Sequence, residues 1–122
     1  AAPVAALSEY RAALTAAIAE MTDATAALTA LRDSGEVNLA LANATPYLDA
    51  FGHVVLGWMW LRQALVAQRA LGTATGSDLD FYRGKLSACR YFYRYELPKV
   101  AERCALLKSF DDTCLAADEQ WF

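Results

Sequence analysis

Residues 44–71 constrain the fold most, because this stretch is apolar on nearly every side. Its apolar residues recur at alternating spacings of four and three: Tyr47, Phe51, Val54, Trp58, Leu61 and Leu65. This spacing is typical of a helix. Leu56 and Trp60 lie on the opposite side, and residues 54–61 carry no charged or amide side chain. A helix that is apolar all round must be covered all round. It therefore either runs through the centre of a bundle or presents one side to another protein surface.

Length, composition and charge favour one helical domain over residues 1–122. The mixture is rich in Leu, Ala, Glu and Arg, which favours helix. The net charge of −3 gives no reason to expect nucleic-acid binding. The apolar run of residues 54–61 is too short to cross a bilayer, so we expect no transmembrane segment. Three cysteines without framework spacing are interpreted as reduced thiols in the core of a cytoplasmic protein.

The first predicted helix follows Pro3 and ends at Gly35, a residue that tolerates a left-handed backbone. Its apolar side chains repeat in strict heptad spacing: Leu7, Tyr10, Leu14, Ala17, Met21, Ala24, Leu28 and Leu31. The connection after Gly35 is short, so we expect the next helix to run antiparallel. That second helix is predicted from near Glu36 to Leu71, with a bend at Pro46; a fresh start capped by Thr45 is the alternative.

The third predicted helix spans residues 78–108 and keeps its apolar phase across Pro98. We interpret it as one helix with a proline kink, with two helices as the alternative. Residues 110–122 are acidic with an aromatic end and are predicted as a short helix or a docked tail. The fold class is thus an all-α antiparallel bundle of three long helices plus a short helical piece. Its predicted core consists of Leu14, Met21, Leu28, Phe51, Val54, Trp58, Leu61, Leu65, Leu86, Cys89 and Tyr93.

No catalytic, cofactor-binding or metal-binding residue is assigned. His53 is the only histidine and has Asp49 one helical turn before it, which allows a hydrogen-bonded pair. A catalytic dyad would need a nucleophile beside it, so we prefer a structural role. Arg83, Arg90 and Arg94 share one helix face and are able to bind phosphate or carboxylate. We prefer pairing with acids of a neighbouring helix or domain.

The aromatic residues of the third helix exceed what one core accepts. Helical geometry does not let all the aromatic side chains within residues 81–95 point to the same side. We therefore predict that some of them form an interface with a second subunit or domain. Its candidate residues are Leu56, Trp60, Phe81, Phe92, Tyr95, Arg83, Arg90 and Arg94.

Two stretches resemble a known family: ATPYLDAFGHVVLGWMWLRQAL at residues 44–65 and DFYRGKLSACRYFYRYELP at residues 80–98. Together with the ending DDTCLAADEQWF, they are similar to the C-terminal extension of acyl-CoA dehydrogenases, in the subgroup that includes methylthiopropionyl-CoA dehydrogenase. The resemblance covers most of residues 36–122 and combines two signatures in their order and spacing. The first helix is compatible with it but carries no signature.

The resemblance implies a parent enzyme that uses FAD to oxidise an acyl-CoA to its 2-enoyl form. The catalytic glutamate and the flavin contacts belong to preceding domains and correspond to no residue of this sequence. The chain is then expected to be a non-catalytic domain, without a cofactor of its own, of a larger flavoenzyme of fatty acid metabolism. Its expected partners are the rest of the dehydrogenase chain and a second subunit in a homodimer. The alternative is a free-standing helical protein that binds a partner or a small ligand.

Overall fold

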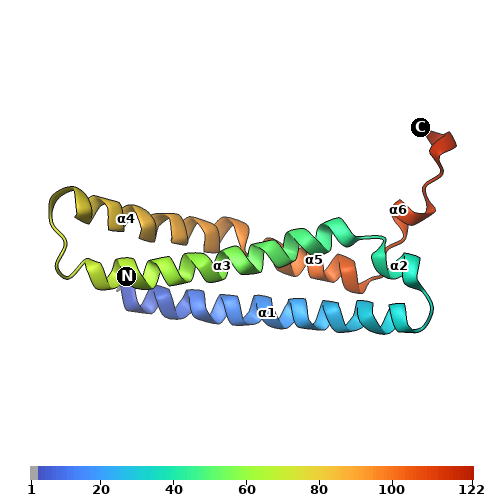
Figure 1. The fold of residues 1–122 in the computed structure, drawn as a ribbon, viewed down its shortest axis with the longest axis horizontal. Coiled ribbons are helices and arrows are strands. Elements are labelled where there is room, and N and C mark those ends of the chain that lie inside the picture. Colours follow the sequence, from blue (N-terminus) through green and yellow to red (C-terminus); the bar gives the residue numbers. More distant parts are fainter. Residues whose placement is uncertain (1–2) are drawn as a thin grey trace.

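The computed structural model describes residues 3–122, and within them it contains helices and no strand. Three long rods, residues 3–33, 37–70 and 76–108, run antiparallel to their neighbours along the chain: left to right, right to left and left to right in Figure 1. This arrangement confirms the predicted all-α bundle. The elements are α1 (Pro3–Asp33), α2 (Val37–Leu41), α3 (Ala44–Ala70), α4 (Gly76–Tyr91), the π-helical turn η1 (Phe92–Glu96), α5 (Lys99–Lys108), α6 (Thr113–Ala116) and the 3₁₀ turn η2 (Glu119–Trp121).

Gly35 ends the first rod as the sequence predicts. Its φ of 102° lies in the left-handed region that glycine adopts without strain. The amide of Gly35 donates to the carbonyl of Arg32 at 3.0 Å, and the amide of Glu36 donates to that of Leu31 at 3.3 Å. This pair of bonds is the Schellman arrangement, which satisfies carbonyls that a helix end leaves free. The chain therefore reverses within a few residues.

The second rod is broken, and the predicted continuous helix with a bend at Pro46 is wrong. A turn at Ala42 and Asn43 separates α2 from α3, and Asn43 rather than Thr45 precedes the new start. Pro46 is the third residue of α3. The first four amides of any helix have no partner within it, so the missing N–H costs nothing at this position.

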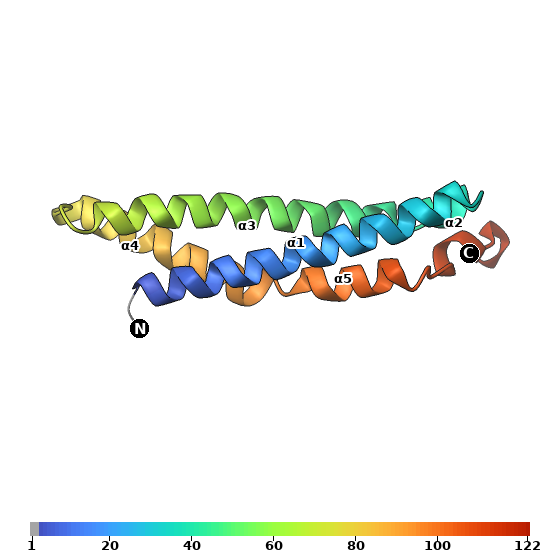
Figure 2. The same cartoon turned by 90° about the horizontal axis from the view of Figure 1, so that it is seen from below.

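The third rod is also divided, so the alternative of two helices holds over one kinked helix. The amide of Leu97 donates to the carbonyl of Phe92 at 2.9 Å, which closes a π-helical turn immediately before Pro98. The wider turn accommodates a proline that a regular helix would not. α4 packs against α3, while α5 packs against both α1 and α3 (Figure 2). The π turn thus joins two segments that have different neighbours.

The core is built from large residues of α1 and the third rod packed against small residues of α3. Leu14, Met21, Cys89 and Tyr93 are buried as predicted, and Leu28, Val54, Leu61 and Leu86 are partly buried against the same core. Phe51, Trp58 and Leu65 were predicted there and are instead 50%, 49% and 41% exposed. The buried residues of α3 are Ala50, Gly57, Ala64 and Ala67. The physical reason is close approach: small side chains let neighbouring helices come nearer than bulky ones would.

Two of the three thiols lie in the core, as predicted. Burial raises the pKa of the Cys89 thiol to about 11 and raises that of Cys104 as well, so both stay protonated at neutral pH. Cys114, in α6, is exposed, which corrects its assignment as a core residue. The described helices include none that is long and apolar enough to cross a bilayer.

Candidate interaction surface

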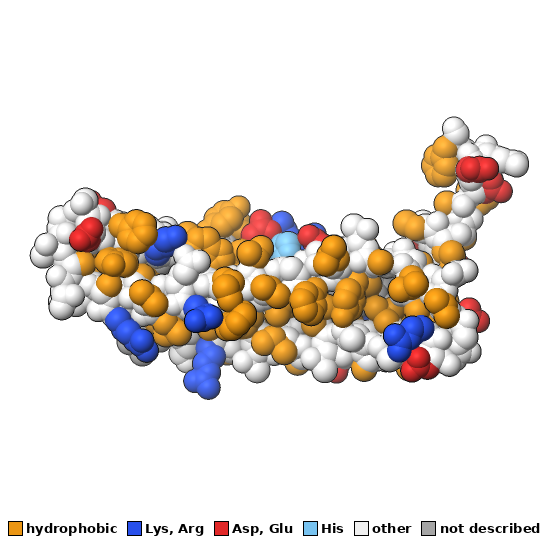
Figure 3. Space-filling view, in the orientation of Figure 1, with side chains coloured by type: hydrophobic (Ala, Val, Ile, Leu, Met, Phe, Trp, Pro, Cys, Tyr) orange, Lys and Arg blue, Asp and Glu red, His pale blue; other side chains and the backbone are white. Residues whose placement is uncertain are grey.

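The outward side of α3 carries a row of large apolar side chains, which we call the α3 stripe. It follows the face of the bundle that looks towards the viewer in Figure 3. Its first four members recur at spacings of three and four, so they share one side of the helix. The α3 stripe consists of Leu48, Phe51, Val55, Trp58, Leu65 and Val66, each at least 40% exposed.

The inward side of α3 explains why the stripe stays outside. At Gly57 a β-carbon would lie 3.2 Å from Leu97 Cδ1 and 3.4 Å from Leu14 Cδ1, so α1 and the segment after η1 already fill the space. The buried Tyr93 hydroxyl donates a hydrogen bond to the carbonyl oxygen of Gly57 at 2.7 Å. The bundle therefore closes on backbone and small side chains, and the bulky residues of α3 are left for other contacts.

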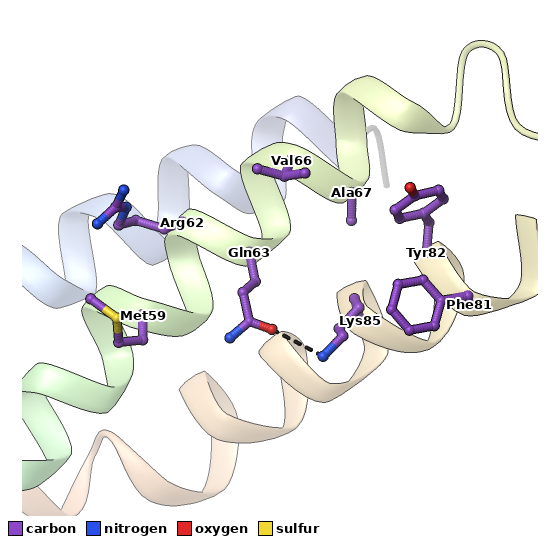
Figure 4. A pocket seen from close by; sticks show the side chains of 8 residues that line it. All are labelled: Met59, Arg62, Gln63, Val66, Ala67, Phe81, Tyr82 and Lys85. Carbon is purple, nitrogen blue, oxygen red and sulfur yellow. Dashed lines mark hydrogen bonds between the residues drawn. The ribbon is translucent and has the colours of Figure 1, made fainter. Parts of the chain in front are cut away.

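A groove between α3 and α4 lies beside one end of the stripe. It has a volume of about 390 Å³, and its side chains come from both helices (Figure 4). Lys85 Nζ donates to Gln63 Oε1 at 3.0 Å and stands 5.5 Å from the ring centroids of Trp60 and Phe81. The lining, which we call the α3–α4 groove, consists of Met59, Arg62, Gln63, Val66, Ala67, Phe81, Tyr82 and Lys85. It contains two cations and no carboxylate, so it suits an apolar group next to negative charge.

A polar cluster ties α3 to the third rod. His53 Nε2 lies 3.2 Å from Glu96 Oε2, and Lys99 Nζ donates to the same oxygen at 2.9 Å. The hydrogen bonds from Lys99 and His53 lower the pKa of the Glu96 carboxyl. Asp49 meets His53 Nδ1 mainly through its backbone carbonyl, at 2.9 Å, and its carboxylate pairs with Arg103. Each contact links different elements or successive turns, which is the geometry of a structural connection.

The histidine–glutamate contact was not foreseen. The sequence predicts the neighbour one turn away, Asp49, but Glu96 lies 43 residues further along the chain than His53. No periodicity on a single helix reports such a pair. Among residues 3–122 there is no group of three His, Cys, Asp or Glu side chains with the arrangement of a metal site.

The predicted interface residues divide into three groups in the structure. Leu56, Phe81 and Tyr95 are exposed, while Trp60 is partly buried against the core. Phe92 is buried at 7% exposure, so its placement on an outer surface was wrong. Phe92 and Tyr93 lie three and four residues after the buried Cys89, so all three share one face of the helix, and that face is turned to the core.

The predicted arginine face is exposed. Within the described chain, none of Arg83, Arg90 and Arg94 forms an ion pair, so acids of a neighbouring helix in this domain do not cover them. Tyr91 and Tyr95 stack beside the last two arginines with ring centroids 4.8 Å apart. This face is separate from the α3–α4 groove, whose cations are Arg62 and Lys85.

The sequence did contain a signal for the correct face of α3. Ala50, Gly57 and Ala64 recur every seven residues, and all three are buried. A repeat of small residues marks close helix packing as well as a repeat of large ones does. Large apolar residues at the neighbouring positions mask it, because hydrophobicity alone ranks them above alanine and glycine for burial.

Comparison with known proteins identifies a family and a relative. Residues 1–118 match the family described as "Acetyl-CoA dehydrogenase C-terminal like". Over 77 residues, 62% of this chain, the sequence is 32% identical to a Mycobacterium tuberculosis protein named broad-specificity linear acyl-CoA dehydrogenase FadE5. The matched part covers 13% of the length of that protein.

Proposed function

Because the chain belongs to the acetyl-CoA dehydrogenase C-terminal-like family, we propose that it serves as a non-catalytic helical domain of a larger FAD-dependent acyl-CoA dehydrogenase. The parent enzyme would oxidise an acyl-CoA to the 2-enoyl-CoA. The similarity to a protein named as an acyl-CoA dehydrogenase, over a small part of that protein's length, supports this assignment. Membership of the methylthiopropionyl-CoA subgroup and a cytoplasmic location remain predictions.

The α3 stripe is the observation that carries the proposed role. Six large apolar side chains lie side by side on one helix of a bundle that is already closed on its other face. Exposed apolar patches of this kind mark interaction sites in soluble domains. We infer that the stripe packs on the dehydrogenase body or on a second subunit, and that the domain shapes the enzyme's assembly rather than its chemistry.

A first experiment tests the parentage. The natural reading frame upstream of Ala1 is sequenced, and both the full-length protein that it encodes and the 122-residue chain are purified. We expect several hundred preceding residues, a yellow flavoprotein from the whole frame and a colourless chain from the fragment. A frame that begins near Ala1, or a stoichiometric flavin on the fragment, would favour the free-standing binding protein.

A second experiment tests the stripe. In the full-length enzyme, Trp58→Glu places a charge in the middle of the stripe, and Ile18→Glu is the matched control, since Ile18 is an apolar residue of α1 with 47% exposure. We expect Trp58→Glu to loosen the domain, measured as faster proteolytic release of the C-terminal fragment, and Ile18→Glu to leave release unchanged. Equal release from both variants and the unmodified enzyme would contradict a buried stripe.

A further inference from the structure

The α3–α4 groove contains positive charge that the described chain does not neutralise. Neither Arg62 nor Lys85 forms an ion pair within residues 3–122. The two carboxylates of α4, Asp78 and Asp80, are not part of the lining of the groove. Both cations are therefore available to an anion that comes from outside the described chain.

The side-chain amide of Gln63 adds further hydrogen-bond donors at the same place. Lys85 Nζ donates to Gln63 Oε1 at 3.0 Å. An ammonium group only donates, so the amide oxygen must face Lys85, and the amide nitrogen is turned away from it (Figure 4). The polar part of the groove thus consists of the Lys85 ammonium, the Gln63 N–H groups and the Arg62 guanidinium, which are all donors. A carboxylate offers only acceptors, so it is the group that fits this set.

The rest of the lining is apolar and lies beside these donors. Val66 and Ala67 of α3, and Phe81 and Tyr82 of α4, stand nearer the loop that joins the two helices (Figure 4). The lining segment of α3, residues 59–67, covers about 12 Å at helical rise. The volume of about 390 Å³ is near the lower end of the range of ligand pockets. The groove therefore has room for a short apolar tail next to the carboxylate.

We propose that the α3–α4 groove is a binding site for a small amphipathic carboxylate, with an unbranched alkanoate as its chemical class. The carboxylate accepts hydrogen bonds from Lys85, Gln63 and Arg62, and the alkyl chain lies along the apolar lining towards Phe81. All of these donors and the whole apolar lining belong to this chain. The proposal is thus independent of the place of the domain in a larger enzyme.

Both halves of the ligand are needed for affinity. An inorganic anion would leave the apolar lining in water, whereas an uncharged chain would leave the donors unmatched. Each CH₂ group buried in the groove should raise the affinity about two- to fourfold while the tail still fits. The hydrogen bonds to charged donors should contribute a factor of about ten or more.

Tryptophan fluorescence of the 122-residue chain measures the binding. Trp60 is the reporter, because Lys85 Nζ lies 5.5 Å from its ring centroid. Trp58→Phe with Trp121→Phe removes the other two tryptophans. We expect saturable binding of octanoate, and binding of hexanoate that is about four- to sixteenfold weaker. Octan-1-ol and acetate, which each lack one half of the ligand, should bind at least tenfold more weakly than octanoate. Calorimetry on the unmodified chain repeats the measurement without a reporter.

Gln63→Glu is the sharpest variant, since it exchanges a donor amide for a carboxylate of nearly the same size. Gln63 is exposed, so the fold should tolerate the change. The new carboxylate would pair with Lys85 and repel the ligand, so octanoate binding should weaken about tenfold or more. Gln120→Glu, at an exposed position of η2, makes the same change of charge outside the groove and should leave the affinity unchanged. Urea unfolding followed by circular dichroism verifies that each variant is folded.

Two further pairs test the two halves of the site separately. Lys85→Gln should weaken octanoate binding about tenfold, with Arg83→Gln on the exposed arginine face as its control. Phe81→Ser should weaken octanoate binding and leave the response to acetate unchanged, with exposed Tyr95→Ser as its control.

The same glutamine variants are compared in the full-length protein, where only the difference between them counts as binding in the groove. Three results would overturn the proposal: no saturable octanoate binding by fluorescence or calorimetry, equal affinity for octanoate and octan-1-ol, or a folded Gln63→Glu variant that binds octanoate as tightly as the unmodified chain. None of these results depends on whether the chain belongs to a flavoenzyme.

Discussion

Three glycines within helices make a matched test of how closely the bundle packs at Gly57. Replacing each by alanine adds the same methyl group to the same backbone. At Gly52 in α3 and Gly84 in α4, the added β-carbon would meet nothing within 4 Å. At Gly57 it would meet Leu97, Leu14 and Phe92 carbons at 3.2, 3.4 and 3.4 Å.

The expected energies follow from these distances. Alanine is better than glycine inside a helix by about 0.8–1 kcal/mol, so Gly52→Ala and Gly84→Ala should raise the free energy of unfolding by up to that amount. At Gly57 the same gain is opposed by overpacking, which typically costs 1–3 kcal/mol in a filled core. We therefore expect Gly57→Ala to be about 1–3 kcal/mol less stable than the other two variants.

Urea unfolding followed by far-UV circular dichroism measures the three differences on one scale. The slope of unfolding free energy against urea should stay the same, so that midpoints compare directly. Gly57→Leu serves as the stronger perturbation and should lose most of the cooperative transition. If Gly57→Ala were as stabilising as Gly52→Ala, the close contact between α3 and the segment after η1 would be disproved.

Other predictions concern the core and the polar cluster. Leu107→Ala, at a side chain 1% exposed, should cost about 2–5 kcal/mol of unfolding free energy, while Trp58→Ala, half exposed, should cost only about 1–2 kcal/mol. Equal costs in urea melts would contradict the outward position of Trp58 on α3. Tyr93→Phe removes one buried hydrogen bond and should cost about 1 kcal/mol, read from thermal melts against a Tyr95→Phe control at an exposed ring. The hydrogen bonds that lower the pKa of the Glu96 carboxyl stabilise the fold at pH values above the unfolded pKa of 4.5. This stabilisation is lost as the pH falls through the lower pKa of the folded state. Glu96→Gln should therefore flatten the acid side of the stability profile, and an unchanged slope would rule out this contribution.

The sequence predicted the helices of this fold well where a single helix carries its own signal. The heptad row of the first rod, the glycine that ends it and the antiparallel return all follow from local rules. The breaks at the second and third rods were harder, because both prolines lie within stretches whose apolar phase appears continuous. A short turn before Pro46 and a π turn before Pro98 each preserve that phase closely enough to resemble an unbroken helix.

The candidate surface was predicted in kind but not in its residues. Surplus apolar area on the second and third helices is present in the structure, and Leu56, Phe81 and Tyr95 are part of it. The second helix is rotated relative to the prediction, since Phe51 and Trp58 are exposed and the residues before them, Ala50 and Gly57, are buried. Val54 and Leu61 still pack against the core. Hydrophobicity ranks a tryptophan above a glycine for burial, whereas close packing of two helices ranks them in the opposite order.

The use of small residues on the inner side of α3 has a consequence for how such a domain changes over generations. The side chains that hold the bundle together and the side chains that meet a partner are different sets on one helix. Replacing Leu48 or Val66 by another apolar residue leaves the contacts at Gly57 untouched. Substitutions on the α3 stripe are therefore able to change which partner the domain binds without changing its fold. The same helical bundle is then able to take part in different assemblies.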